Sequence, residues 1–242
     1  MSEAALLKTN QEIDAHGYAI IHDPEIEQLS KAGRAEYVNY LFSSRINPTR
    51  MPFDFRSLVH EPWRKLAIGS HIGLGDPYAQ NLQSTYFDSE DSNFPGLSGI
   101  FKKMLRIRDQ LMGLDEGFGN NPDRDGFWNA CRIHHYPRGG GFMAMHKDTH
   151  FPNIIDAQLS KPFYQISVLL SRKLSHFHSG GGFLIDSQGN KVDLEIRAGF
   201  GAMVIFDGRT PHGVDDVDLD QLIDFSKADG RLAAFVNLYK VL

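Results

Sequence analysis

The chain has 242 residues, enough for one large domain and too few for two ordinary ones. Its formal net charge is −5 and its Lys and Arg residues form no long run, which disfavours a nucleic-acid-binding surface. No stretch approaches the roughly 20 apolar residues of a membrane span, and the first residues lack the apolar core of a signal peptide. We therefore expect a cytoplasmic protein, and the sequence indicates no oligomeric state.

The first half of the chain is predicted to be largely helical. Apolar residues at helical spacing predict helices over residues 2–16, 24–42 and 96–112, and a short strand over Tyr18–Ile21. Each helix carries one apolar face and one polar face. We therefore expect these helices to pack against a sheet.

From residue 127 onwards the pattern changes to short β segments separated by Gly and Pro. The predicted strands span residues 128–136, 142–146, 164–170, 182–185, 192–196, 202–206, 213–217 and 232–238. Eight strands at this spacing suit a double-stranded β-helix, or jelly roll, whose inner faces enclose a pocket. The predicted fold is mainly β with flanking helices: one domain over 1–242, with a jelly-roll core (127–242) packed against a helical N-terminal support (1–126).

Three residues of this second half form a candidate metal site. His146 and Asp148 stand two positions apart on one predicted strand, so both side chains point to the same face, and Lys147 points away. His212 lies at the entry to a later strand, where a neighbouring strand can present it to the same point. Two histidines and one carboxylate can hold one face of an octahedral iron(II) and leave the other face open.

Several further sequence features occur in a fixed order around these three residues. They are Tyr136, the pair His146 and Asp148, the step Gly181-Gly182, the approach formed by Gly201, Phe206 and His212, and the strand start Gly230-Arg231. Together they resemble the iron(II)- and 2-oxoglutarate-dependent oxygenases, and among these the prolyl-hydroxylase-like branch. The resemblance covers about residues 132–236.

The resemblance implies a role for each matching residue. His146, Asp148 and His212 would bind Fe(II), and Arg231 would bind the distal carboxylate of 2-oxoglutarate, because a guanidinium matches a carboxylate bidentately. Tyr136 would add a phenolic hydrogen bond to that carboxylate. The implied reaction uses 2-oxoglutarate and O2 as cosubstrates, releases succinate and CO2, and hydroxylates an unactivated C–H bond.

The sequence departs from the family pattern near Arg231. In many relatives this arginine follows the second histidine by about ten residues and precedes a Ser or Thr by two; here the gap from His212 is 19 residues, and Ala233 occupies that position. Ser167 or Gln165 on a facing strand can supply the missing polar group.

Arg132, Arg138 and Lys240 remain alternative anchors for the cosubstrate.

Other residues receive simpler interpretations. Cys131 is the only cysteine, and we expect a buried thiol. One of His134 and His135 is expected to face the pocket, since neighbouring strand residues point to opposite faces. Residues 149–162 are expected to form part of a lid, and the acidic segment 215–229 a solvated loop.

The predicted substrate is a small molecule, for instance an amino acid or a biosynthetic intermediate, because the chain has no room for an added recognition domain. Two other functions stay open. A zinc-dependent hydrolase could use the same three ligands with a bound water. A jelly-roll binding protein without catalysis would need no metal redox chemistry.

Overall fold

The structure is a computed structural model that describes residues 1–43, 62–71, 77–148 and 163–241. Its helices are α1 (Glu3–His16), α2 (Pro24–Ser43), α3 (Pro95–Met112), α4 (Pro122–Asp125) and α6 (Leu194–Arg197). No helix among the described residues is long and apolar enough to cross a membrane. The strands are β1 (Tyr18–Ile21), β2 (Trp63–His71), β3 (Tyr78–Phe87), β4 (Phe127–Pro137), β5 (Gly141–His146), β6 (Tyr164–Leu169), β7 (Gly181–Ile185), β8 (Lys191–Asp193), β9 (Met203–Asp207), β10 (His212–Val217) and β11 (Gly230–Lys240).

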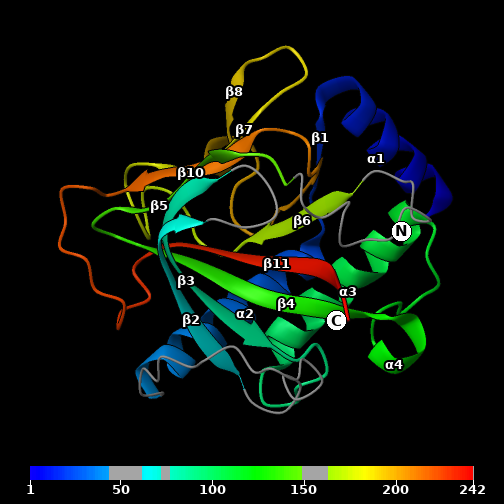
Figure 1. Cartoon of the computed structure of the whole chain (residues 1–242), viewed down its shortest axis with the longest axis horizontal. Coiled ribbons are helices and arrows are strands. Elements are labelled where there is room, and N and C mark those ends of the chain that lie inside the picture. Colours follow the sequence, from blue (N-terminus) through cyan, green and yellow to red (C-terminus); the bar gives the residue numbers. More distant parts are fainter. Residues whose placement is uncertain (44–61, 72–76, 149–162, 242) are drawn as a thin grey trace.

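The strands form one antiparallel, curled sheet in the order β1-β9-β6-β11-β4-β3-β5-β10-β7-β8, with β2 paired to β3 (Figure 1). β3 joins the two halves of the roll, because it pairs with β4 along much of its length and with β5 at Gln80 and Asn81. The two halves face each other across an interior, as in a jelly roll. This architecture confirms the fold class predicted from the sequence.

The larger half of the sheet packs against helices on its outer face. Figure 1 shows α2 and α3 behind β4 and β11. Alternation along β4 explains the arrangement: Cys131 and Ile133 belong to the core shared with the helices, whereas Arg132 and His134 line the interior. The apolar faces predicted for the helices are therefore used for packing, and Cys131 is a buried thiol as expected.

Helices α2 and α3 pack closely against each other where Gly33 meets Gly96. A Cβ atom at Gly96 would lie 2.6 Å from the backbone nitrogen of Gly33, closer than real side chains pack. Glu36 on α2 also accepts hydrogen bonds from the backbone N–H groups of Gly96 (2.7 Å) and Leu97 (2.9 Å) at the start of α3. A carboxylate at a helix N-terminus is favourable, because it satisfies free N–H groups and faces the positive end of the helix dipole.

Two strands that were not predicted, β2 and β3, lie in the half of the chain that was expected to be largely helical. β2 and β3 pair over nine residue pairs, and β3 lies within the sheet rather than beside it. The description of residues 1–126 as a helical support was therefore wrong for these two segments. β3 carries polar residues on both faces, because Gln80 and Ser84 line the interior while Gln83 and Thr85 bond to Tyr37 of α2, so its pattern is not that of a strand with one dry face.

The strand predicted over residues 192–196 was also wrong. β8 ends at Asp193, whose side chain accepts hydrogen bonds from the N–H groups of Glu195 and Ile196 and begins the short helix α6. Aspartate is a preferred N-cap residue because its carboxylate satisfies such free donors. As a result Leu194 and Glu195 are both buried, although an alternating strand would have placed them on opposite faces.

We predict that Gly96→Ala lowers the free energy of unfolding by about 1–3 kcal/mol, the usual cost of overpacking, since the new methyl group meets backbone atoms. Gly99→Ala is the matched comparison on the same helix, because its methyl group would meet only the flexible end of Leu29. Denaturant unfolding of the two variants checks this. Equal loss of stability in both would contradict the account.

Candidate active site

The three candidate metal ligands come together at one end of the roll. His146 is the last residue of β5, Asp148 follows it, and His212 begins β10, where it pairs directly with His146 across the two antiparallel strands. One ligand atom from each of the three side chains lies within 4.8 Å of the others. His146, Asp148 and His212 thus lie together, as the sequence predicted.

The hydrogen bonds of the two imidazoles direct the same ring nitrogen toward Asp148. His146 Nδ1 lies 2.9 Å from the carbonyl oxygen of Ala144, and His212 Nδ1 lies 2.9 Å from that of Thr210. A carbonyl oxygen only accepts, so each Nδ1 carries the proton and each Nε2 carries the lone pair. The Nε2 atoms lie 3.6 Å and 3.5 Å from the Asp148 carboxylate oxygens.

Burial keeps His212 neutral at physiological pH. Its removal from water lowers its pKa to about 4, against the opposing effect of its hydrogen bond to Thr210. A neutral imidazole with a free Nε2 is the form that binds a metal. The donor set of two nitrogens and one carboxylate, all directed to one point, therefore fits a divalent metal such as Fe(II).

A chain of buried side chains holds Asp148. Gln165 Nε2 donates to Asp148 Oδ2 at 2.6 Å, and Asn237 Nδ2 donates to Gln165 Oε1 at 2.9 Å. Arg132 Nη2 in turn donates to Asn237 Oδ1. Such outer contacts orient a ligand, and a chain whose donors all run the same way strengthens each of its bonds. Gln165, which the sequence suggested for the cosubstrate, instead contacts the metal ligand.

The ligands open into a cavity of about 390 Å³ inside the roll. This volume is in the range of sites for small molecules. The residues that line the cavity include Leu82, Met143, Phe183, Leu194, Phe206 and Val214 among apolar side chains. Tyr78 stacks on the His146 ring, with 4.0 Å between centroids.

Arg231, the predicted cosubstrate anchor, lines this cavity and is 2% exposed. Its Nε donates to Glu195 Oε1 at 2.6 Å, and both side chains are buried. Its Nη1 is buried without a hydrogen-bond partner in the part of the chain that the structure describes. A buried donor left without an acceptor is costly, so it points to an acceptor from a ligand.

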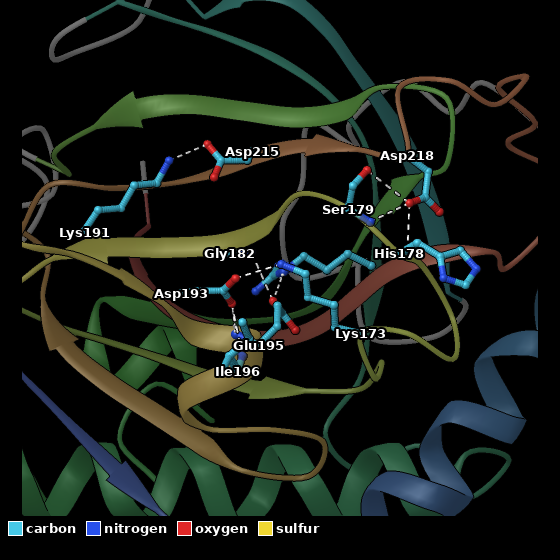
Figure 2. Close-up of polar contacts among 11 residues, drawn as sticks. Lys173, His178, Ser179, Gly182, Lys191, Asp193, Glu195, Ile196, Asp215 and Asp218 are labelled. Atoms are coloured by element: carbon cyan, nitrogen blue, oxygen red, sulfur yellow. Dashed lines mark hydrogen bonds and ion pairs between the residues drawn. The ribbon is translucent and has the colours of Figure 1, made fainter.

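The close contact between Gly182 and Arg231 explains why the sequence has a glycine at the second position of the Gly181-Gly182 step. A Cβ atom at this position would lie 2.5 Å from Arg231 Nη2, so only glycine leaves room for the guanidinium. The Gly182 N–H also donates to Glu195 Oε1 at 3.1 Å, a contact drawn in Figure 2. Glu195 was not predicted as a site residue; it falls within residues 192–196, which the sequence predicted to be a strand.

Tyr136 and His134 lie beside Arg231 on the inner face of β4. Tyr136 pairs with Arg231 across β4 and β11, and its ring centroid lies 5.3 Å from the guanidinium carbon. Its hydroxyl group lies 3.4 Å from His134 Nδ1. His134 is thus the histidine that faces the pocket, and His135 points to the helices, where it bonds to the carbonyl oxygen of Asp229.

The alternative anchors have different positions. Arg138 donates to Asp218 at 2.7 Å and does not line the cavity, so it is not placed to bind the cosubstrate. Arg132 and Lys240 both line the cavity. Arg132 Nη1 donates to the hydroxyl groups of Tyr239 (2.9 Å) and Tyr86 (3.4 Å).

The acidic segment after β10 is partly structural. Asp218 is buried and accepts from the backbone N–H groups of His178 and Ser179, both at 2.7 Å (Figure 2). Burial alone would raise the pKa of Asp218, but these hydrogen bonds and Arg138 hold it below its ordinary value. The expectation of a solvated loop was therefore wrong for Asp218. The predicted lid, residues 149–162, lies outside the described residues.

No family model matches the chain, and no curated protein matches it in sequence. The solved structures similar to this chain include prolyl hydroxylases and other 2-oxoglutarate- and iron(II)-dependent oxygenases. The resemblance drawn from the sequence is thus confirmed at the level of the fold.

Three of these structures illustrate the similarity. A Pseudomonas putida prolyl-4-hydroxylase is 14% identical, with a TM-score of 0.57 over 98% of this chain and 99% of that one. A Trichoplax adhaerens prolyl hydroxylase in complex with a hypoxia-inducible-factor peptide is 12% identical, with a TM-score of 0.55 over 98% and 90%. EctD from S. alaskensis with bound Fe is 16% identical, with a TM-score of 0.51 over 100% and 77%. Such identities establish a shared fold and not a shared substrate.

Three histidines with lowered pKa values should make the metal-free protein less stable in mild acid. Burial lowers the pKa of His135 and His212 to about 4 and that of His134 well below its ordinary value. The unfolded chain binds these protons near pH 6.5 and the folded chain does not. Stability is therefore complete above pH 6.5 and falls toward pH 4, by up to about 1.4 kcal/mol per pH unit for each histidine.

Urea unfolding between pH 7.5 and 5 measures this slope. His135→Gln should make the slope shallower, because it removes one of the three groups from a position outside the metal site. A free energy of unfolding that does not change over this range would contradict the assignment of neutral histidines.

Proposed function

We propose that this protein is an iron(II)- and 2-oxoglutarate-dependent dioxygenase that hydroxylates an unactivated C–H bond of a small molecule and releases succinate and CO2. The observation that carries the proposal is the convergence of His146, Asp148 and His212 at one point in a fold shared with such oxygenases. When bound, the metal would supply the activation of O2 and the oxidative decarboxylation of 2-oxoglutarate.

The ligand residues would hold the metal by one face only. Both Nε2 atoms present lone pairs, and Asp148 is held in place by Gln165 and by its own backbone N–H, which donates to the carbonyl oxygen of Gly208 at 2.8 Å. This arrangement leaves the cavity side of the metal open for the keto acid and O2. A set of ligands held this firmly needs little rearrangement on binding.

Arg231 and Tyr136 would hold the far end of 2-oxoglutarate. Glu195 fixes the guanidinium through Nε, so Nη1 remains for the carboxylate of the cosubstrate. Because Glu195 already neutralises Arg231, much of the charge of the dianionic cosubstrate would be balanced by the divalent metal. The apolar side chains of the cavity would keep water from the reacting atoms.

The small-molecule part of the proposal rests on the size and enclosure of the cavity. The similar structures include one bound to a peptide and one, EctD with 2-oxoglutarate, bound to 5-hydroxyectoine. A cavity of about 390 Å³ inside the roll suits a small molecule. A zinc hydrolase would use the same three ligands, but it would have no need for the unpaired Nη1 of Arg231.

The purified protein should convert 2-oxoglutarate to succinate slowly without its true substrate, with iron(II) and O2 both required. His146→Ala and His212→Ala should abolish this turnover, because each removes a nitrogen ligand. His178→Ala is the control, since His178 is exposed and lies outside the cavity. Equal succinate formation with zinc in place of iron, or turnover retained in a ligand variant, would contradict the proposal.

The substrate itself can be sought with a metabolite extract, by mass spectrometry for an oxygen-dependent gain of one oxygen atom.

Loss of Arg231 should weaken 2-oxoglutarate binding about thirty-fold or more, since removing one partner of a buried charged contact costs on the order of 2–5 kcal/mol and about 1.4 kcal/mol is tenfold. The variant to test is Glu195→Gln/Arg231→Gln, because the single change would leave Glu195 buried without its partner. Calorimetric titration of 2-oxoglutarate into the anaerobic iron(II) protein measures the effect.

Arg138→Gln is the matched control, since this arginine is paired with Asp218 outside the cavity. If the double variant binds 2-oxoglutarate like the parent protein and Arg132→Gln loses this binding, the cosubstrate anchor is Arg132 and not Arg231.

A further inference from the structure

The cavity is positively charged although the chain as a whole is negative. Its described lining holds four cationic side chains, Lys65, Arg132, Arg231 and Lys240, and one carboxylate, Asp148. The formal net charge of the chain is −5, so this distribution is local. A cleft of one sign with low-dielectric walls concentrates ligands of the opposite charge.

The proposed metal and cosubstrate would not remove this excess. A divalent metal and dianionic 2-oxoglutarate balance each other, and Arg231 is balanced by Glu195. Three cations of the lining then remain, Lys65, Arg132 and Lys240, and Asp148, the one carboxylate of the described lining, is already a candidate metal ligand. An anion bound in the loaded site would be attracted by these cations.

Arg132 is the most deeply placed of the three remaining cations. Its guanidinium donates to Tyr239, Tyr86 and Asn237, and none of these partners carries a negative charge. Burial raises the pKa of the Tyr239 phenol to about 12, so it stays neutral. No described carboxylate forms an ion pair with Arg132, and its Nε is buried without an acceptor. A guanidinium in such a place is costly unless a counter-charge arrives.

The position of Arg132 separates it from the cosubstrate anchor and links it to the metal ligands. It lies four residues before Tyr136 on β4, about 13 Å along the strand, and Arg231 pairs with Tyr136. At the same time Asn237 and Gln165 connect it to Asp148 through three hydrogen bonds. An anion on Arg132 would thus lie away from the end where 2-oxoglutarate is held, and Asn237 and Gln165 would connect its binding site to Asp148.

The rings of Tyr86 and Tyr239 lie beside this guanidinium, with their centroids 6.0 Å and 5.8 Å from its central carbon. Tyr86 stacks on Trp63 with 4.0 Å between ring centroids, and Trp128 packs against Tyr239 at 5.4 Å. Lys65 and Lys240 are exposed where they line the cavity, so they can attract an anion from solvent. Rings of this kind fix the guanidinium in one orientation and offer a flat apolar surface to the body of a ligand.

We propose that Arg132 is the centre of a substrate subsite that binds the carboxylate or phosphate group of a small organic anion. The proposal rests on the proposed function, because it assigns Arg231 and the metal to 2-oxoglutarate and leaves Arg132 for the substrate. The substrate class is therefore a small molecule with an oxyanion at one end and an apolar or aromatic body next to it.

The test uses three probes with the same ring: benzoate, phenyl phosphate and the neutral benzamide. Each is titrated calorimetrically into the protein loaded with iron(II) and 2-oxoglutarate under nitrogen, so that no turnover occurs. At least one anion should bind about tenfold or more tightly than benzamide, equivalent to about 1.4 kcal/mol. The stronger of the two anions identifies the subsite as one for carboxylate or for phosphate.

Three variants assign the preference to Arg132. Arg132→Gln should remove it, and Arg132→Lys should keep part of it, since the charge remains without the planar fork. Arg106→Gln is the matched control, because Arg106 is exposed on α3 and its charge lies outside the cavity. Thermal unfolding of each variant shows whether it is folded.

The proposal is overturned if the parent protein binds benzamide as tightly as both anions, if neither anion binds at millimolar concentration, or if folded Arg132→Gln keeps the preference. The same titrations without metal and 2-oxoglutarate separate this result from the proposed function. Failure of 2-oxoglutarate to bind would contradict the oxygenase proposal, and the anion preference of the metal-free protein would still decide the role of Arg132.

Discussion

The antiparallel pairing of β5 with β10 is the constraint on which the site depends. It places His212 opposite His146, and the backbone carbonyls of Thr210 and Ala144 then orient both rings. Asp148 continues from the end of β5 toward the same point. The rest of the roll serves this pairing, because β3 connects β5 to the helix-backed half of the sheet and so closes the cavity in front of the ligands.

The inner face of β4 and β11 carries a second constraint. Strand alternation directs Arg132, His134 and Tyr136 inward and gives the opposite face to the helices. The two cavity arginines differ in the charge of their partners. Arg231 forms an ion pair with Glu195, and Arg132 donates to the neutral side chains of Tyr239 and Asn237. A buried ion pair rarely adds much stability, so an arrangement of this kind is better explained by the ligands it would bind than by folding.

The hydrogen-bonded chain from Arg132 to Asp148 joins the two constraints. Each amide in it has its donor directed toward the metal ligand, and Asn237 and Gln165 are both buried. In a medium of low dielectric constant, a change of charge at one end of such a chain alters the other end more than it would in water. Charge balance at Arg132 therefore bears directly on the electrostatics of the metal ligand.

Much of the site followed from local patterns in the sequence. Because His146 and Asp148 are separated by one residue, strand alternation puts both side chains on one face, and His212 stands at the entry to a later strand. The candidate role of Arg231 followed from the family resemblance. Glu195 could not be predicted in the same way, because Asp193 ends a strand where hydrophobic alternation continues. β3 was missed because both of its faces mix polar and apolar residues. The partners Asn237 and Gln165 meet only through the pairing of distant strands.

The central claim is that His146, Asp148 and His212 form one metal site whose open side faces 2-oxoglutarate held by Arg231. A crystal structure with Mn(II) and 2-oxoglutarate, phased to show the metal by its anomalous signal, tests it most directly. The account predicts one metal peak bound by both Nε2 atoms and the Asp148 carboxylate, with the distal carboxylate of 2-oxoglutarate on Arg231 Nη1. A metal bound elsewhere, or a cosubstrate whose distal carboxylate contacts Arg132 instead, would contradict it.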